Sequence, residues 1–205
     1  MNIKSFIPLA LIVLITCDSS TRNNNSVSQK PVPVPREKVL EFHEAIKSGN
    51  INQFRKMAAD RRLLDAPDEN GLTSLHIAIV HARLSMAQAI INAGADVNAT
   101  TKYLETPLHL AVSRNKLFQF SPPFLAALLI RKGAKVNACD KNGVTPLHYA
   151  VWSLELVKML VNNGADIHTK AYNMTPLQAA EMCLDRNEGV VRYLKGLMKA
   201  EAESL

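Results

Sequence analysis

The pattern of hydrophobic and polar positions divides the 205-residue chain into three parts. An apolar run extends from Phe6 to Ile15, interrupted only by Pro8, and gives way to polar residues at Asp18. Residues 18–35 are rich in Ser, Asn and Thr and then Pro, a composition that cannot bury enough apolar surface to fold. From Arg36 the sequence repeats itself, beginning with two amphipathic stretches. The pattern therefore predicts a signal peptide at 1–16, a disordered linker at 17–35 and a helical domain at 36–200.

The helical domain carries two short motifs that recur in step. A helix-opening tetrapeptide occurs at Thr73-Ser74-Leu75-His76, Thr106-Pro107-Leu108-His109, Thr145-Pro146-Leu147-His148 and Thr175-Pro176-Leu177-Gln178. A closing motif begins at Gly94, Gly133 and Gly164. Thr is a good N-cap, Pro suits the first helical position, and Gly accepts the left-handed backbone after a helix. The spacing predicts units at about 36–67, 68–100, 101–139, 140–169 and 170–200, with the first and last acting as caps.

These motifs resemble the ankyrin repeat, and the resemblance covers about residues 36–200. It implies an all-α solenoid of about five helix-turn-helix units with projecting β-turn fingers. It also implies binding to another protein through the finger tips and the inner helices. Offsets from the tetrapeptides give the candidate partner-binding residues Asn70, Lys102, Tyr103, Arg114, Lys141, Asn142, Trp152, Tyr172 and Met174. Tyr103, Arg114, Trp152 and Tyr172 are of the types that dominate interface energies. Trp152 has an alternative, which is to turn inward and fill space.

Three departures from the repeat predict local differences. The third unit is six residues longer between its helices, and we assign the insertion to residues 118–123. Phe118 and Phe120 in it form either a contact loop or a plug over the outer helices. The fourth unit is two residues shorter, which we assign to its interhelix loop. In the third finger, Leu104 and Thr101 replace the usual Gly and Asp, so we expect that finger to turn differently.

The sequence gives no support for catalysis or for a bound metal. His76, His109 and His148 occur once per repeat, about 8 to 10 Å apart, whereas a metal needs its donors within roughly 2 Å of itself. We therefore expect these rings to be structural, each bridging a threonine and a finger backbone. No phosphate loop or nucleophile motif is present, so we expect neither an enzyme nor a cofactor. The basic residues of this +6 chain are scattered, which argues against nucleic acid. We expect a monomer, with Cys139 and Cys183 packed as small apolar residues. For Cys139, which lies in a finger beside Asp140, the alternative is a reactive thiol.

The residues that end the apolar run resemble the bacterial lipoprotein box. Leu14-Ile15-Thr16-Cys17 places a cysteine at the expected junction, although Thr16 stands where Gly, Ala or Ser is usual. The resemblance implies lipid on Cys17 and a tether in the cell envelope, facing the periplasm, and Asp18 favours the inner membrane. The chain would there hold or inhibit a partner protein. The alternative is an ordinary cleaved signal and a secreted effector that binds a host protein.

Overall fold

The computed structural model describes residues 34–113, 122–183 and 187–203, and these form five successive helix pairs. The pairs are α1 (Arg36–Ser48) with α2 (Ile51–Met57), α3 (Ser74–Val80) with α4 (Leu84–Asn92), α5 (Pro107–Val112) with α6 (Pro122–Arg131), α7 (Pro146–Tyr149) with α8 (Leu154–Asn162), and α9 (Pro176–Met182) with α10 (Glu188–Glu203). A short 3₁₀ turn, η1 (Arg61–Leu63), follows α2. The signal peptide, Cys17 and the linker to residue 33 lie outside the described residues, as do Arg114, Phe118 and Phe120.

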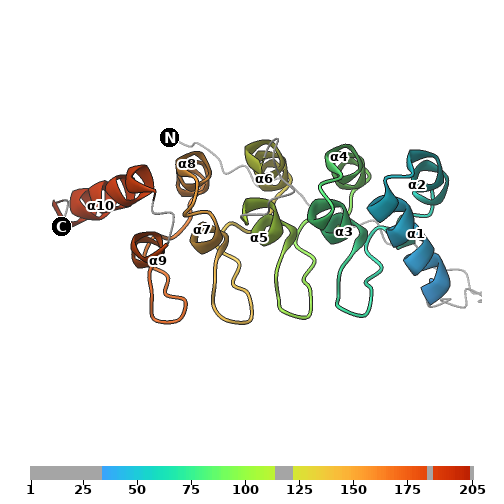
Figure 1. The fold of residues 1–205 in the computed structure, drawn as a ribbon, viewed down its shortest axis with the longest axis horizontal. Helices are drawn as coiled ribbons and strands as arrows, with labels where there is room; N and C mark the ends of the chain where they lie inside the picture. Colours follow the sequence, from blue (N-terminus) through green and yellow to red (C-terminus); the bar gives the residue numbers. More distant parts are fainter. Residues whose placement is uncertain (1–33, 114–121, 184–186, 204–205) are drawn as a thin grey trace, which may run out of the picture. The chain divides into compact units, whose positions relative to one another are not determined.

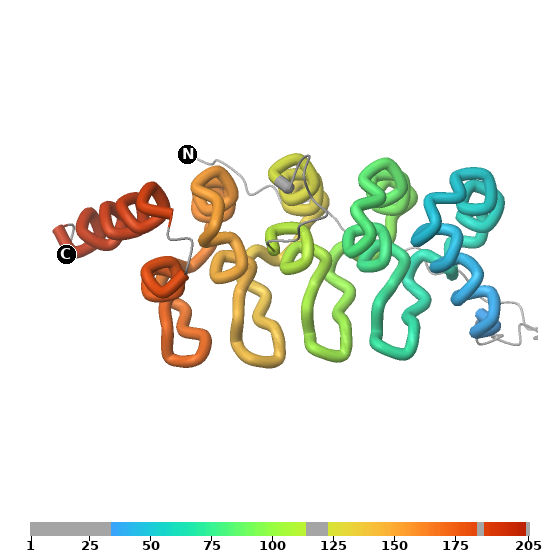
Figure 2. Tube along the Cα trace, viewed as in Figure 1, coloured from blue at the N-terminus to red at the C-terminus, as the bar shows by residue number. Residues whose placement is uncertain are grey.

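The five pairs stack side by side over residues 34–203. Figures 1 and 2 show α1, α3, α5, α7 and α9 in one row and their partners in a second row, with looped fingers projecting from the first row. The first row is called the inner helices below. In the described part of the chain the only β pairing is an isolated bridge between Ala171 and Met174. The predicted all-α solenoid with projecting fingers is confirmed.

The repeated motifs start and end helices as their chemistry predicts. Thr73, Thr106, Thr145 and Thr175 are the N-caps of α3, α5, α7 and α9, and in the last three helices a proline follows the cap. Gly94 follows α4 with a φ of 88°, and its N–H donates to the Ile91 carbonyl at 3.1 Å. Gly133 and Gly164 repeat this geometry with φ values of 90° and 85°. A side chain would be strained in that conformation, which explains the glycine.

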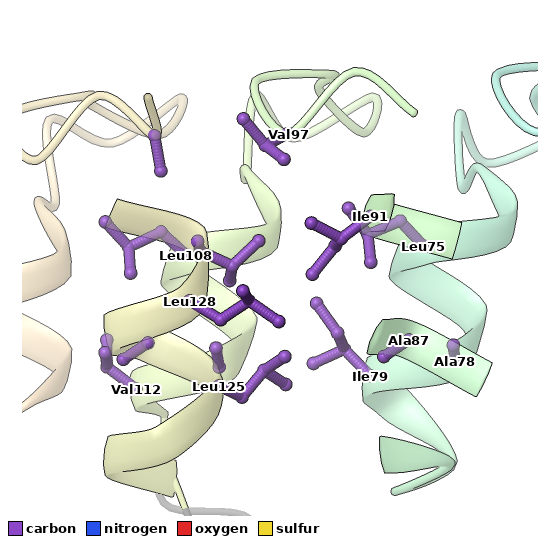
Figure 3. Packing of buried hydrophobic residues seen from close by; sticks show 14 of the residues in the cluster. Leu75, Ala78, Ile79, Ala87, Ile91, Val97, Leu108, Val112, Leu125 and Leu128 are labelled. Atoms are coloured by element: carbon purple, nitrogen blue, oxygen red, sulfur yellow. The ribbon is translucent and has the colours of Figure 1, made fainter. Parts of the chain in front are cut away.

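The core runs through the stack between consecutive pairs. Figure 3 shows Ile79 and Ile91 of the second repeat facing Leu125 and Leu128 of the third. Side chains of this size contribute roughly 1.5 to 3 kcal/mol each when fully buried. The alanines two positions after each tetrapeptide, Ala78, Ala111, Ala150 and Ala180, are buried and let the inner helices approach one another. Because each repeat covers its neighbour, the fingers are held by a continuous core, against which Leu72 of the second finger also packs.

A polar ladder on the connecting loops also ties the repeats together. The Asn98 side chain donates to the Gly133 carbonyl at 3.0 Å and accepts from the Lys135 N–H at 2.8 Å. Asn137 does the same one repeat later, to the Gly164 carbonyl at 2.8 Å and the Asp166 N–H at 2.9 Å. Asn98 and Asn137, four residues after Gly94 and Gly133, therefore each fix the next repeat, a role that the motif alone did not reveal.

The shortening of the fourth unit falls on the inner helix, so our assignment to the loop was wrong. Helix α7 has four residues, whereas the equivalent α3 has seven. The connection to α8 spans residues 150–153, against 81–83 in the second unit, so the loop is one residue longer. The assignment of 118–123 to the insertion also needs correction, because Pro122 and Pro123 begin α6. Proline tolerates the first helical turn, where N–H groups lack acceptors.

The third finger turns as its neighbours do, and the expectation of a different turn was wrong. Leu104 takes the left-handed conformation with a φ of 60°, where Gly71 and Gly143 have 79° and 78°. Thr101 replaces the aspartate acceptor, because its hydroxyl lies 3.2 Å from the Tyr103 N–H and 3.3 Å from the Glu105 N–H. The stack imposes the finger geometry on residues that do not favour it.

Leu104→Gly should therefore stabilise the protein by about 1 kcal/mol, since a left-handed backbone costs a side-chain-bearing residue roughly 1 to 2 kcal/mol. Little packing is lost, because the leucine is 49% exposed. Urea denaturation measures the change. The matched control is Gly143→Ala, whose added Cβ would lie no closer than 3.7 Å to its neighbours and which should destabilise by a similar amount. Equal stability of wild type and Leu104→Gly would show that the leucine conformation is not strained.

Candidate partner-binding face

The finger tips carry most of the candidate binding residues on exposed positions. Asn70, Lys102, Tyr103, Lys141, Asn142 and Tyr172 are exposed, and Met174 is half-buried. Tyr103 and Tyr172 occupy the equivalent place in the third and fifth fingers, with 63% and 66% of their surfaces exposed. Exposed tyrosines supply contact area at little entropic cost, so these two positions suit a protein interface.

Neighbouring fingers are joined through their backbones. The N–H of Lys102 donates to the Asn70 carbonyl at 2.9 Å, and the N–H of Lys141 donates to the Tyr103 carbonyl at 2.8 Å. The second, third and fourth fingers are thus held in fixed register. A contact surface that is already ordered loses less entropy when it binds.

The charges on the third to fifth fingers are sorted, with cations outward and carboxylates inward. Lys102, Lys141 and Lys170 are exposed on successive fingers and form no ion pair within the described residues. Asp140 is 7% exposed; one carboxylate oxygen accepts two finger N–H groups, and the other accepts the Tyr149 hydroxyl at 3.2 Å. Burial and the nearby carboxylates raise the pKa of Tyr149, which keeps its hydroxyl protonated and able to donate. The tips therefore present positive charge.

Trp152 does not join this surface in the described structure. Arg114 lies outside the described residues. Trp152 is half-buried, and its indole N–H donates to the Val112 carbonyl at 2.9 Å. Its own carbonyl accepts from the Asn187 side chain at 3.1 Å. The indole thus points into the stack, as the alternative of an inward tryptophan requires, and the indole and backbone carbonyl of Trp152 together link three repeats.

The repeated histidines are structural bridges. The Nδ1 atoms of His76, His109 and His148 accept the N–H of the threonine opening their helix at 3.0–3.2 Å. On the other side, Nε2 of His109 lies 3.1 Å from the Val144 carbonyl and Nε2 of His148 lies 3.2 Å from the Met174 carbonyl, each in the next finger. This pair of bonds fits a neutral ring with its hydrogen on Nε2. The predicted bridge is confirmed for His109 and His148. In His76, Nε2 has no hydrogen-bond partner within the described residues, so only the threonine side is formed.

Burial keeps these rings neutral. It lowers the pKa of His76 to about 4, and it lowers the pKa of His109 and His148 below the ordinary value of 6.5. Protonation would also place a hydrogen on Nδ1, where the threonine N–H already donates. The histidines hold the fingers and offer no free basic group on the tips.

Both described cysteines are exposed, so the expectation that Cys139 and Cys183 are packed was wrong. Cys139 directly precedes Asp140 of the fourth finger, and Cys183 follows α9. In the described ranges no cluster of three or more His, Cys, Asp or Glu residues has the arrangement of a metal site. Within those same ranges no helix has the length and apolar character needed to cross a membrane.

A pocket of about 330 Å³ lies between the fourth and fifth fingers. Its walls include Val144 from the fourth finger, Tyr149 from α7, Tyr172 and Met174 from the fifth finger, and Ala179 from α9. Sequence reasoning selected Tyr172 and Met174 but did not anticipate the pocket. The sequence contained one sign that the fifth finger differs from the others: Lys170 stands where the second and fourth fingers have the aspartates Asp68 and Asp140.

Comparison with known proteins agrees with this architecture. Residues 101–171 and 119–203 match the family model for ankyrin repeats in three copies, and residues 57–117 match that for ankyrin repeats in many copies. The chain is 34% identical over 82 residues to alpha-latrotoxin-Lg1a of Latrodectus geometricus, a match covering 38% of this chain and 6% of the toxin. Inversin of Danio rerio is 31% identical over 77 residues, covering 38% and 8% of the two chains.

The RelA-associated inhibitor of Mus musculus is 33% identical over 72 residues, covering 35% of this chain and 9% of that protein. The chain thus matches less than a tenth of the length of these relatives. What it shares with them is the repeat, which generally serves as a non-catalytic module for binding other proteins. The matches to the repeat models together extend over residues 57–203, and the chain belongs to the ankyrin-repeat family.

Proposed function

We propose that the chain is a non-catalytic adaptor that holds or inhibits a partner protein at a bacterial envelope, with its finger tips as the contact surface. The observation that carries the proposal is the sorted charge of the third to fifth fingers. Lys102, Lys141 and Lys170 are exposed, whereas the nearby Asp140 is buried and bonded. Positive tips of this kind favour a partner with an acidic surface, because complementary charge speeds encounter and selects partners.

Reversing the finger charges should release the partner. The triple variant Lys102→Glu, Lys141→Glu and Lys170→Glu should capture at least about tenfold less cross-linked partner at low salt, since each reversal removes one attraction and adds one repulsion. The matched control is Lys56→Glu, Lys132→Glu and Lys135→Glu, which changes the net charge equally at exposed positions away from the fingers. Equal losses in both triples would mean that net charge, and not the finger tips, attracts the partner.

The envelope location is supported by the sequence Leu14-Ile15-Thr16-Cys17 and by the polar, proline-ending stretch that follows it. Acyl chains on Cys17 would tether the repeats, because two lipid signals give stable membrane attachment where one is marginal. Residues 18–35 would then act as a spacer. Asp18 favours retention at the inner membrane.

The Cys17→Ala variant tests the tether. Wild-type protein should partition into the detergent phase and carry the mass of acyl chains, and Cys17→Ala should stay in the aqueous phase without that mass. The repeat domain should melt at the same temperature in both, because Cys17 precedes it. Equal partitioning of the two would support the alternative of a secreted effector, which Thr16 in place of Gly, Ala or Ser favours.

A further inference from the structure

The pocket between the fourth and fifth fingers exists because the backbone link between fingers is interrupted there. In the third and fourth fingers, the N–H groups of Lys102 and Lys141 donate to backbone carbonyls of the preceding finger. The equivalent N–H in the fifth finger belongs to Ala171, and it donates to the Met174 carbonyl of its own finger at 3.0 Å. The Ala171 N–H therefore makes no backbone bond to the fourth finger, and the space between the fourth and fifth fingers remains open.

The walls of this pocket suit an apolar group. The lining residues Val144, Met174 and Ala179 have no free polar side-chain atoms. Two of the polar side chains that border the pocket are already engaged, because Asp140 accepts from its own finger and from Tyr149, and His148 bridges Thr145 and Met174. Of the remaining polar side chains in the lining, Asn142 and Tyr172 are exposed. A polar ligand group would find few partners there, whereas an apolar side chain would lose no hydrogen bond. The volume is at the low end of the roughly 300 to 1,000 Å³ typical of ligand sites, which suits one large side chain.

Two features of the pocket rim indicate which residues of a ligand would flank an apolar side chain bound in the pocket. Lys141 and Lys170 are exposed on the two fingers that flank the pocket, and neither forms an ion pair within the described structure. Tyr172 is 66% exposed although its backbone is left-handed, with a φ of 49°, and Asn173 follows with 61°. A left-handed tyrosine is unfavourable unless something compensates, and such outliers concentrate at functional positions.

We propose that this pocket binds a large apolar side chain, Phe or Leu in type, flanked by carboxylates in an extended segment of the partner protein. The side chain enters between Val144 and Met174, the Tyr172 ring covers it, and the flanking carboxylates pair with Lys141 and Lys170. The inference rests on the proposed function and gives the chemistry of the partner. It also distinguishes the fifth finger from the third, which has the same exposed tyrosine but whose Lys102 N–H donates to the preceding finger.

The test uses the full chain in detergent and a fluorescein-labelled peptide with the sequence Gly-Ser-Asp-Glu-Phe-Glu-Asp-Ser-Gly. Fluorescence anisotropy should show salt-sensitive binding that weakens about tenfold when Phe is replaced by Ser, as expected for a buried anchor. Replacing the acids by Asn and Gln should weaken binding similarly. A peptide that binds equally well with Ser in place of Phe would overturn the proposal.

Matched variants then locate the site. Tyr172→Ala should weaken binding about tenfold, and Phe124→Ala, which truncates an aromatic side chain 49% exposed on α6 and away from the fingers, should leave it within about twofold. Ala179→Leu should abolish binding, because the added side chain fills the pocket without changing charge, and circular dichroism checks that the helices persist. Equal losses for Tyr172→Ala and Phe124→Ala, or undiminished binding by Ala179→Leu, would overturn the pocket.

Two further outcomes separate this inference from the proposed function. If the peptide fails to bind while the finger lysine triple still loses the cross-linked partner, the pocket is wrong and the finger surface stands. If a single-stranded thymidine oligonucleotide binds as tightly as the peptide and displaces it, the lysines and tyrosines recognise phosphate and bases, and the peptide assignment is overturned.

Discussion

Acidification from pH 7 to pH 5 should lower the free energy of unfolding by at least about 2 kcal/mol, because the buried histidines stay neutral while the unfolded chain protonates. The pKa of His76 is about 4 in the fold, against 6.5 for the unfolded residue. Between these two values the unfolded state binds more protons, so stability falls as the pH drops from about 6.5 and levels off near 4. His76 alone contributes about 2 kcal/mol of this loss at pH 5. Burial lowers the pKa of His43, His109 and His148 as well, so their contributions have the same sign.

The fifth repeat supplies the control for this prediction. Gln178 stands in the histidine position, and its side-chain oxygen accepts the Thr175 N–H at 2.9 Å without a titratable ring. Replacing His76, His109 and His148 together by Gln should therefore keep the contact to each threonine and flatten the pH dependence. Urea midpoints between pH 5 and pH 7 measure the slope. An equally steep slope in the triple variant would assign the acid sensitivity to other groups.

Leu108→Ala should destabilise the protein by about 3 to 4 kcal/mol, because it removes a fully buried side chain and leaves a cavity that neighbouring repeats cannot fill. Leu108 opens α5 in the middle of the stack, and Figure 3 shows it among the apolar side chains of the second and third repeats. Thermal and urea unfolding measure the loss. The whole unfolding transition should shift, because the third repeat connects the first two repeats to the last two.

Leu177→Ala is the matched control, since Leu177 has the same place in the last tetrapeptide. It is only partly buried, because the fifth repeat has a neighbour on one side. Its truncation should cost roughly 1 kcal/mol. Similar losses for Leu108→Ala and Leu177→Ala would contradict the idea that stability comes from burial between repeats.

The parts of the fold governed by local rules could be predicted from sequence. Thr145 followed by Pro146 has one favourable use, the start of a helix, and Gly133 after an apolar stretch has one favourable use, its end. Because these positions recur in step, the repeat boundaries and the stack followed. The exposed tyrosines, Tyr103 and Tyr172, could be predicted for the same reason, since finger positions are fixed by their offset from each tetrapeptide.

The parts that depend on contacts between repeats could not be predicted. Leu104 disfavours the turn it adopts, but the fingers on either side hold it there, so local propensity gave the wrong expectation. The two residues that the fourth unit lacks near Tyr149 could have been lost from the interhelix loop or from the inner helix. The sequence spacing is the same in both cases, and packing decides between them. The pocket depends on which carbonyl receives the Ala171 N–H, a choice that no spacing encodes.

That same choice at Ala171 changes how hydrogen exchange should report on the last finger. The N–H groups of Lys102 and Lys141 can exchange with solvent only if adjacent fingers separate, since each donates to the preceding finger, whereas the Ala171 N–H exchanges when a bond within its own finger opens. The fifth finger stays joined to the fourth repeat through the His148 ring, which lies 3.2 Å from the Met174 carbonyl. A ligand seated in the adjoining pocket would slow deuterium uptake at Ala171 and Met174, whereas uptake at Lys102, two fingers away, would stay unchanged.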